Sequence, residues 1–270
     1  METRILEKLA CPSCATGKPA PQGPDAAGPA LICAACGAVY PNRDGIIDLT
    51  GGAEKPRLFS SQWAMEFRPI TALYERVWRP MVTVPFSDLA WELGQTRDYL
   101  ALTPRVDLLD LACGPGNFTR HFAKTITEGA VVGADLSLPM LKKGVRELGR
   151  EGAPAITLMR VDVTKWPFAA GSFDRVHCAG ALHLFPDLPR VFASIRNSLR
   201  EGGVFVGSTY CVAEGAVKRM FQGYVSAAHG FHWFRPEELA GLAARAGFSG
   251  WEHRTRKQGI VFRAARDKRP

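Results

Sequence analysis

The stretch VDLLDLACGPGNF, residues 106–118, decides the fold class that we expect for this chain. It begins as an apolar run typical of a buried parallel strand and ends in a glycine-rich turn. Similar apolar runs follow along the chain, namely AVVGADL, AITLMRV, FDRVHCAG, GVFVGSTY and GIVFRA. They alternate with stretches of helical spacing, namely FTRHFAKTI, PMLKKGVREL, LPRVFASIRNSL and RPEELAGLAARAG. This alternation predicts an α/β fold with a mainly parallel sheet flanked by helices.

The size and composition are those of an ordinary globular protein. The chain has 270 residues, of which 46% are hydrophobic and 22% are charged, so it can bury a full core in one main domain plus a small appendage. The start, METRILEKLACPSC, has no long apolar run after its charges, and aspartates interrupt the later runs. We therefore expect no signal peptide, no membrane span and a cytoplasmic location.

The charge distribution allows an anionic partner without requiring one. The formal net charge is +8, and Arg and Lys gather in the tail that starts at His253. The apolar run GIVF is interleaved with these charges and is typical of a strand. We therefore favour a solvated, solubilising end over a binding site for the tail.

Four of the seven cysteines form two C-x-x-C pairs separated by a loop rich in Pro, Gly and Ala; they are Cys11, Cys14, Cys33 and Cys36. Two such turns let four thiolates surround a Zn²⁺ ion, which replaces the core that about fifty residues cannot build. Disulfides and a thioredoxin-like redox pair are the alternatives, and both fit the spacing and the reducing compartment less well. A closed four-cysteine site predicts structural zinc. The remaining cysteines, Cys113, Cys178 and Cys211, fall in or beside strands, where we expect buried, inert thiols.

The glycine turn first suggests a nicotinamide or flavin dinucleotide. That fingerprint needs a third glycine for close helix packing, and Thr119 stands at that position after Gly114 and Gly116. The next strand ends at Asp135, whose carboxylate is placed to accept hydrogen bonds from ribose hydroxyls. Taken alone, these features suit several nucleotides.

Two further carboxylates favour an adenosine without a diphosphate. Asp162, with Val163, follows the third strand, where its carboxylate can accept from an exocyclic amine while a backbone N–H donates to the ring. Asp110 precedes the glycine turn, where it would repel a pyrophosphate and suit a sulfonium or ammonium group.

At this point the chain resembles the class I S-adenosylmethionine (SAM)-dependent methyltransferases. The resemblance rests on LLDLACGPGNFTR, VVGADLS with Pro139-Met140-Leu141, VDVTKWPFAAGSFDRV, Ala181-Leu182-His183, LREGGVFVGSTY and FRPEELAGLAARAGF, in family order. It implies a Rossmann-like, doubly wound sheet of seven strands with a reversed last hairpin, and SAM at the carboxyl ends of the strands. The site residues that it implies are Asp110, Ala112 and Gly114 for the methionine end, Asp135 for the ribose, Leu136 and Met140 for the adenine faces, Asp162 and Val163 for the adenine edge, and Cys178 and Ala179 beneath the sulfonium. Gly116 completes the cofactor-binding turn.

The first fifty residues resemble the small zinc-ribbon proteins that activate tRNA, rRNA and release-factor methyltransferases, because LEKLACPSC and LICAACGAVYPNRDGIIDLT follow their pattern. We divide the chain into a zinc ribbon (1–50), a helical linker and substrate lid (51–100) and a methyltransferase domain (101–270). The lid segment is rich in aromatic side chains, namely Phe59, Trp63, Phe67, Tyr74, Trp78, Phe86 and Trp91. They suit either a substrate pocket or packing against the main domain.

The motif after the fourth strand bears on the methyl acceptor. Methyltransferases acting on base amines carry N/D-P-P-Y/F there, whereas this chain has CAGALHLF. The Leu182-His183 pair resembles that of enzymes acting on small molecules. His183 is our candidate catalytic residue, because an imidazole of near-neutral pKa can remove a proton from a hydroxyl or an activated carbon. A loop-orienting or helix-capping role is the alternative.

The whole layout resembles plant plastid and bacterial methyltransferase-like proteins, on LYER, WR and the AGALH segment, and also a bacterial rRNA guanine-N1 methyltransferase. Three hypotheses follow. The first is an enzyme that methylates an oxygen or carbon of a small, apolar molecule. The second is an RNA methyltransferase whose ribbon docks RNA, although the ribbon is poor in Lys and Arg. The third is a regulatory protein that binds SAM without turnover.

Overall fold

A computed structural model describes residues 3–21, 30–51, 73, 84, 86–151 and 156–268 of the chain. Most of the aromatic segment that we assigned to a substrate lid lies outside these ranges. Within them, no helix is both long and apolar enough to cross a membrane.

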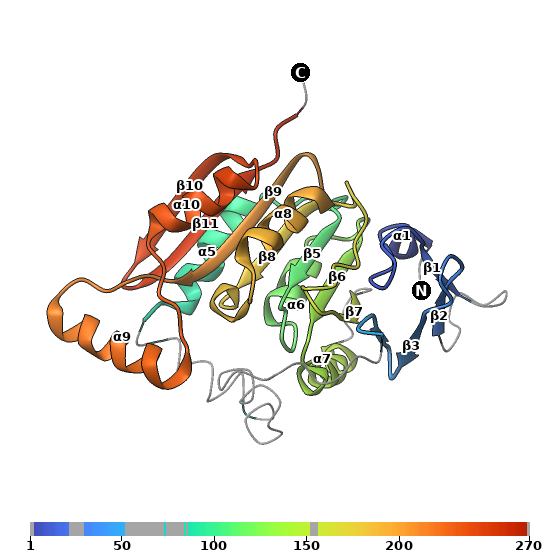
Figure 1. The fold of residues 1–270 in the computed structure, drawn as a ribbon, viewed down its shortest axis with the longest axis horizontal. Coiled ribbons are helices and arrows are strands. Elements are labelled where there is room, and N and C mark those ends of the chain that lie inside the picture. The colour runs from blue at the N-terminus through green and yellow to red at the C-terminus, as the bar shows by residue number, and fades with distance from the viewer. Residues whose placement is uncertain are drawn as a thin grey trace.

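A twisted sheet runs through the described part of the chain, with its strands side by side from β10 at one edge to the N-terminal strands at the other (Figure 1). Its strand order is β1-β2-β3-β4-β7-β6-β5-β8-β9-β11-β10. The strands are β1 (Pro19–Pro21), β2 (Ala30–Cys33), β3 (Val39–Arg43), β4 (Ile46–Asp48), β5 (Leu108–Leu111), β6 (Val131–Asp135), β7 (Ile156–Arg160), β8 (Phe173–Ala179), β9 (Leu199–Tyr210), β10 (Ser249–Arg256) and β11 (Gly259–Ala265).

The strands β5 to β11 form the doubly wound, mainly parallel sheet that the sequence predicts. β4, β7, β6, β5, β8 and β9 pair in parallel, and β11 pairs antiparallel with both β9 and β10. The count of seven strands is too small for the whole sheet, because β4 joins β7 directly and carries β1 to β3 with it. The N-terminal segment therefore extends the main sheet.

Helices cover both faces of this sheet. They are α1 (Thr3–Leu6), α5 (Leu89–Leu100), α6 (Asn117–Ala123), α7 (Leu138–Glu151), the 3-10 helix η2 (Leu182–Leu184), α8 (Leu188–Ser198), α9 (Ala216–His229) and α10 (Pro236–Arg245). Neighbouring strand residues divide between the faces: Leu108 packs with α5 and α6, whereas Leu109 belongs to the core under α8 and α10. A strand buried on both faces has the continuous apolar sequence from which we predicted β5.

Among the elements absent from the sequence-based prediction are β10 and α9. β10 is an edge strand whose residues from Glu252 to Arg256 are mostly exposed, so it lacks an apolar alternation, and we had assigned its end to a solvated tail. The helix α9 projects beside the carboxyl end of β9 (Figure 1). The thiols of Cys178 and Cys211 are buried, as we predicted, and burial raises the pKa of both, whereas Cys113 is only partly buried.

Candidate cofactor and acceptor site

The glycine turn, residues 112–116, connects β5 to α6 through three residues with left-handed backbone. The φ angles are 54° at Ala112, 58° at Gly114 and 84° at Gly116. Glycine adopts this conformation without strain, whereas a residue with a Cβ atom, such as Ala112, does so at a cost. A non-glycine residue held there marks a turn whose backbone geometry matters, as expected where N–H groups face a ligand.

Asp135 holds this turn from the neighbouring strand. Its Oδ2 atom accepts a hydrogen bond from the Gly114 N–H at 2.7 Å, and its Oδ1 atom accepts one from the Ser137 N–H at 2.8 Å. The Asp135 carboxylate, which we expect to bind the ribose hydroxyls, therefore also sets the spacing between the two loops that follow β5 and β6.

Asp110 lies deeper than the sequence suggests. It is 2% exposed, and its carboxylate accepts a hydrogen bond from the Thr119 hydroxyl and lies 2.7 Å from Nδ1 of His177. His177, in the middle of β8, is fully buried against the rings of Phe118 and Phe122. Sequence analysis missed His177, because only strand pairing brings it beside Asp110.

The two loops that we expect around the adenine are both ordered by local hydrogen bonds. Met140 is buried in the first turn of α7, where its N–H donates to the Ser137 hydroxyl at 3.4 Å, and Leu136 is partly buried just before. Asp162 accepts from the N–H and the hydroxyl of Thr164 through Oδ1, at 2.9 and 2.7 Å. A second oxygen of that carboxylate stays available for an amine.

The structure brings the predicted cofactor residues together at the carboxyl ends of the parallel strands. β7, β6, β5 and β8 are parallel neighbours, so the loops after them start side by side. Cys178 is fully buried near the end of β8, and Ala179, the last residue of β8, is partly buried and faces Ser208 across the ladder. Their role beneath a sulfonium stays a prediction.

His183, in η2 after β8, is close to these strand ends. Its ring stacks on Phe231 with the centroids 3.9 Å apart, and its buried Nδ1 atom has no hydrogen-bond partner in the described part of the chain. Burial lowers the pKa of His183 to about 3, with a smaller effect from nearby His232. The near-neutral pKa that we assumed is wrong: the ring is neutral at pH 7 and a weak base.

Phe231, on which this histidine stacks, belongs to an aromatic group that sequence analysis did not assemble. Ring centroids are 4.5 Å apart for Phe231 and Trp233, 5.2 Å for Phe86 and Trp233, and 6.0 Å for Tyr210 and Phe231. These four residues come from three separate segments, and Tyr210 ends β9. The aromatic group forms an apolar wall at the carboxyl ends of β8 and β9.

A buried acid also lies near this wall. Glu92, in α5, is 6% exposed and accepts a hydrogen bond from the hydroxyl of Ser208 in β9. No signal in the sequence marked Glu92, because α5 also carries other polar and charged residues, among them Arg97 and Asp98.

Comparison with known proteins fits this geometry. The family model described as a methyltransferase domain matches residues 108–203. Two chloroplastic methyltransferases of Arabidopsis thaliana, both described as uncharacterized, are 28% identical over 86% of this chain and 30% identical over 75% of it. A malonyl-[acyl-carrier protein] O-methyltransferase of Legionella pneumophila is 32% identical over 50% of the chain. Residues 108–203 therefore form a methyltransferase domain, and the similarity to methyltransferases extends over most of the chain.

A solved structure supports the same fold for the methyltransferase. Phosphoethanolamine N-methyltransferase 2 of Haemonchus contortus, in complex with SAM, superimposes with a TM-score of 0.67, 16% identity and coverage of 78% of this chain and 61% of that chain. The methyltransferase spans 69% and 61% of the two plant relatives and 45% of the Legionella one.

The four N-terminal cysteines of the methyltransferase gather as the spacing predicts. Their Sγ atoms all lie within 4.8 Å of one another, with Cys11 and Cys36 3.6 Å apart and Cys14 and Cys33 3.8 Å apart. Sulfurs around a tetrahedral Zn²⁺ ion are about 3.8 Å apart, so the donor set fits this metal. The Tyr40 hydroxyl lies within hydrogen-bond distance of the Cys11 Sγ atom, at 3.0 Å, and helps to hold that sulfur in place.

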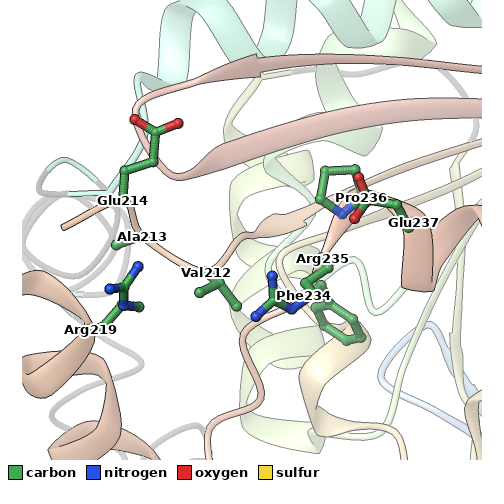
Figure 2. Close-up of a pocket in the computed structure, with 8 residues that line it drawn as sticks. All are labelled: Val212, Ala213, Glu214, Arg219, Phe234, Arg235, Pro236 and Glu237. Carbon is green, nitrogen blue, oxygen red and sulfur yellow. The ribbon is translucent and has the colours of Figure 1, made fainter. Parts of the chain in front are cut away.

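A pocket of about 280 Å³ lies beside the aromatic group, between the starts of α9 and α10. Figure 2 shows Arg219 and Arg235 on its two sides, with Val212 between them. The N–H of Val212 donates to the carbonyl of Phe234 at 2.9 Å and closes the pocket wall. None of its lining residues is among those predicted for SAM.

Proposed function

We propose that this methyltransferase transfers the methyl group of SAM to an oxygen or carbon atom of a small, largely apolar acceptor. The observation that carries the proposal is the aromatic group beside His183, whose Nδ1 atom has no hydrogen-bond partner among the described residues, next to the strand ends where class I methyltransferases bind SAM. An apolar wall with one convergent polar atom is typical of a small-molecule site.

The cofactor residues divide into three parts. We assign the methionine end to Asp110 and to the glycine turn, with Ala112, Gly114 and Gly116. Asp135 accepts from the ribose hydroxyls, and Asp162 with the Val163 N–H binds the adenine edge. Leu136 and Met140 contact the adenine faces, and Cys178 and Ala179 form the floor under the sulfur.

SAM supplies an electrophilic methyl group on a positively charged sulfur. The protein then needs chiefly to hold the acceptor atom in line with the bond that breaks, and positioning of this kind provides much of the rate. The aromatic group orients the acceptor and keeps water away. His183, neutral at pH 7, accepts a hydrogen bond from an acceptor hydroxyl and thereby directs its lone pair, whereas a pKa of about 3 makes full proton removal by the ring unfavourable. The hydroxyl proton therefore passes to solvent water after the oxygen–methyl bond has formed.

We further propose that the four-cysteine cluster holds one structural Zn²⁺ ion. Four thiolates complete the coordination of zinc and leave no position for a substrate. The role of zinc is therefore to hold the N-terminal segment together.

The test is to incubate the purified protein and radiolabelled SAM with a host lysate and to separate solvent-extractable, RNA and protein fractions. Label in the extract supports the proposal and allows the acceptor to be isolated. Label in RNA contradicts it and gives the ribbon a docking role. SAM binding with no labelled product and no S-adenosylhomocysteine in any fraction favours a regulatory protein instead.

A further inference from the structure

Three neighbouring parallel strands end in one row of polar residues. Asp48 ends β4, Arg160 ends β7 and Asp135 ends β6, and Arg160 is the register partner of both aspartates. β4 belongs to the N-terminal ribbon, which the structure describes over residues 3–21 and 30–51. This row therefore runs from the ribbon to the carboxylate assigned to the ribose.

The Arg160 side chain bridges the two sides of this row. Its NH1 group donates to Asp48 Oδ2 at 3.1 Å, and its Nε group donates to the Leu136 carbonyl at 3.0 Å. Asp48 is held in turn, because its Oδ1 atom accepts from the Thr50 N–H at 3.0 Å. The exposed fractions of the two charged side chains are only 19% and 22%, so water screens the pair weakly.

The turn that accepts the hydrogen bond from Arg160 is the one that we assign to binding of the adenosine part of SAM. Leu136 stands between Asp135 and Ser137, whose N–H donates to the Asp135 carboxylate. A shift of the Leu136 carbonyl would displace both the adenine face and the ribose acid. Because a packed site loses affinity with small displacements, Arg160 is placed to matter for cofactor binding.

The ribbon also holds the second adenosine loop. The segment that starts at Asp162 and Val163 leads to Phe168, which forms a β-bridge with Leu9. Two hydrogen bonds flank this bridge: the Ala10 N–H donates to the Pro167 carbonyl, and the Ala169 N–H donates to the Lys8 carbonyl, both at 2.8 Å. The ribbon therefore packs behind both loops.

A buried charge fixes this contact. The Lys8 ammonium is 2.6 Å from Asp107 Oδ2 and donates to the Ser172 carbonyl at 2.8 Å. Lys8 and Asp107 are both nearly inaccessible to water, and Arg200 bonds the same carboxylate at 2.8 Å. Breaking such a pair on one side leaves an uncompensated charge away from water, so this end of the ribbon is firmly attached.

Both contacts lead back to the cysteine cluster. Cys11 directly follows Ala10, and Tyr40, which touches the Cys11 sulfur, lies in β3 next to β4. We infer that the zinc ribbon is a structural part of the SAM site, with Asp48 and Arg160 as positioning residues for the adenosine half. This inference rests on the function proposed above, since it takes the cofactor loops from there.

The test compares SAM affinity by calorimetry for the wild type, Arg160→Met and Asp48→Asn. We expect the Kd to rise about tenfold for Arg160→Met, which is 1.4 kcal/mol, and about threefold for Asp48→Asn, which keeps the bond to Thr50. S-adenosylhomocysteine should show the same ratios, because it shares the adenosine. Removal of zinc from the wild type with a chelator should weaken SAM binding while far-ultraviolet circular dichroism retains the signal of the main domain.

A matched control uses an ion pair at the opposite edge of the sheet. Arg263 NH1 lies 2.7 Å from Glu252, between β11 and β10. Glu252→Gln and Arg263→Met break a similar pair and should leave the Kd unchanged. Urea unfolding of each variant separates lost affinity from lost stability, and Arg160→Lys, which keeps the charge but not both bonds, replaces Arg160→Met should that variant not fold.

The outcomes separate this inference from the proposed function. A wild type that binds SAM, together with an unaltered Kd in folded Arg160 and Asp48 variants, would overturn the inference alone. A wild type that does not bind SAM would overturn the proposed function. Equal losses in the control variants would also overturn the inference, because the effect would then be one of general stability.

Discussion

The imidazole Nδ1 of His177 lies 2.7 Å from the carboxylate of Asp110. Both side chains are buried and belong to neighbouring strands, β8 and β5, and the glycine turn directly follows β5. Thr119, in the helix that follows the turn, donates to the other carboxylate oxygen. These two contacts fix the orientation of the acid assigned to the methionine end of SAM. The site is thus supported from within the sheet as well as from the ribbon.

Replacement of His177 by Leu should destabilise the protein by about 3 kcal/mol, because it leaves a buried carboxylate without one of its two partners. Urea unfolding gives the free energy. The double variant His177→Leu with Asp110→Leu should recover part of the loss, since no buried charge then lacks a partner.

The same double variant separates stability from cofactor binding. We expect it to fold and yet to bind SAM at least tenfold more weakly in calorimetry, because Asp110 is gone. Undiminished SAM affinity would contradict our placement of the methionine end.

Replacement of Asp135 by Ala should abolish detectable SAM binding. The change removes the ribose acceptor and also releases the Gly114 and Ser137 N–H groups that it now holds. Calorimetry on the purified variant measures the loss. Thr164→Ala, which changes only the support of Asp162, is the control and should weaken binding by less than tenfold; retained affinity in Asp135→Ala would refute the ribose assignment.

The positions of the loops assigned to the cofactor were predictable, because each loop depends on a short stretch of sequence. The apolar runs predict strands without any other information, and parallel strands bring their carboxyl ends together. Three of the assigned residues lie at or just after the ends of such runs, namely Gly114, Asp135 and Asp162. The partners of these residues were not predictable in this way. His177 meets Asp110, and Arg160 meets Asp48, only through the strand order, which no local pattern specifies.

The missed elements have a similar cause. The residues of β10 face water on an edge strand, so their spacing resembles that of a solvated tail. The helix α9 has an amphipathic spacing like that of α8 and α10, which sequence analysis overlooked, and it exposes the apolar side chains of Val217, Met220 and Tyr224. The aromatic group likewise needs Phe86, Tyr210 and Phe231 to converge from distant segments.

Salt should have little effect on the affinity for the acceptor. An apolar molecule bound against the aromatic group releases no counterions, whereas an RNA held by several Lys and Arg contacts loses about a thousandfold in affinity between 50 and 200 mM salt. Equilibrium binding of the isolated acceptor at both salt concentrations gives the answer. A steep fall would favour RNA.

One Zn²⁺ ion per chain should be found by elemental analysis of the purified protein. Cys33→Ser should lower that content and destabilise the N-terminal ribbon, because a structural zinc site contributes folding free energy. Cys211→Ser, a buried cysteine far from the cluster in sequence, is the control for the loss of a thiol and should keep the metal. Full zinc content in Cys33→Ser would contradict the four-cysteine assignment.

The pH dependence of stability should reveal the burial of His183. Its folded pKa of about 3 is below the unfolded value, so between these values the unfolded chain binds a proton that the folded chain does not. The contribution of the neutral ring to the free energy of unfolding is therefore complete above about pH 6.5. It is lost as the pH falls, by at most about 1.4 kcal/mol per pH unit. His183→Phe preserves the stack on Phe231 and removes the titration. Urea unfolding at pH 7.5, 6 and 5 should show the wild type losing stability faster than this variant, and parallel curves would mean that the imidazole is open to water.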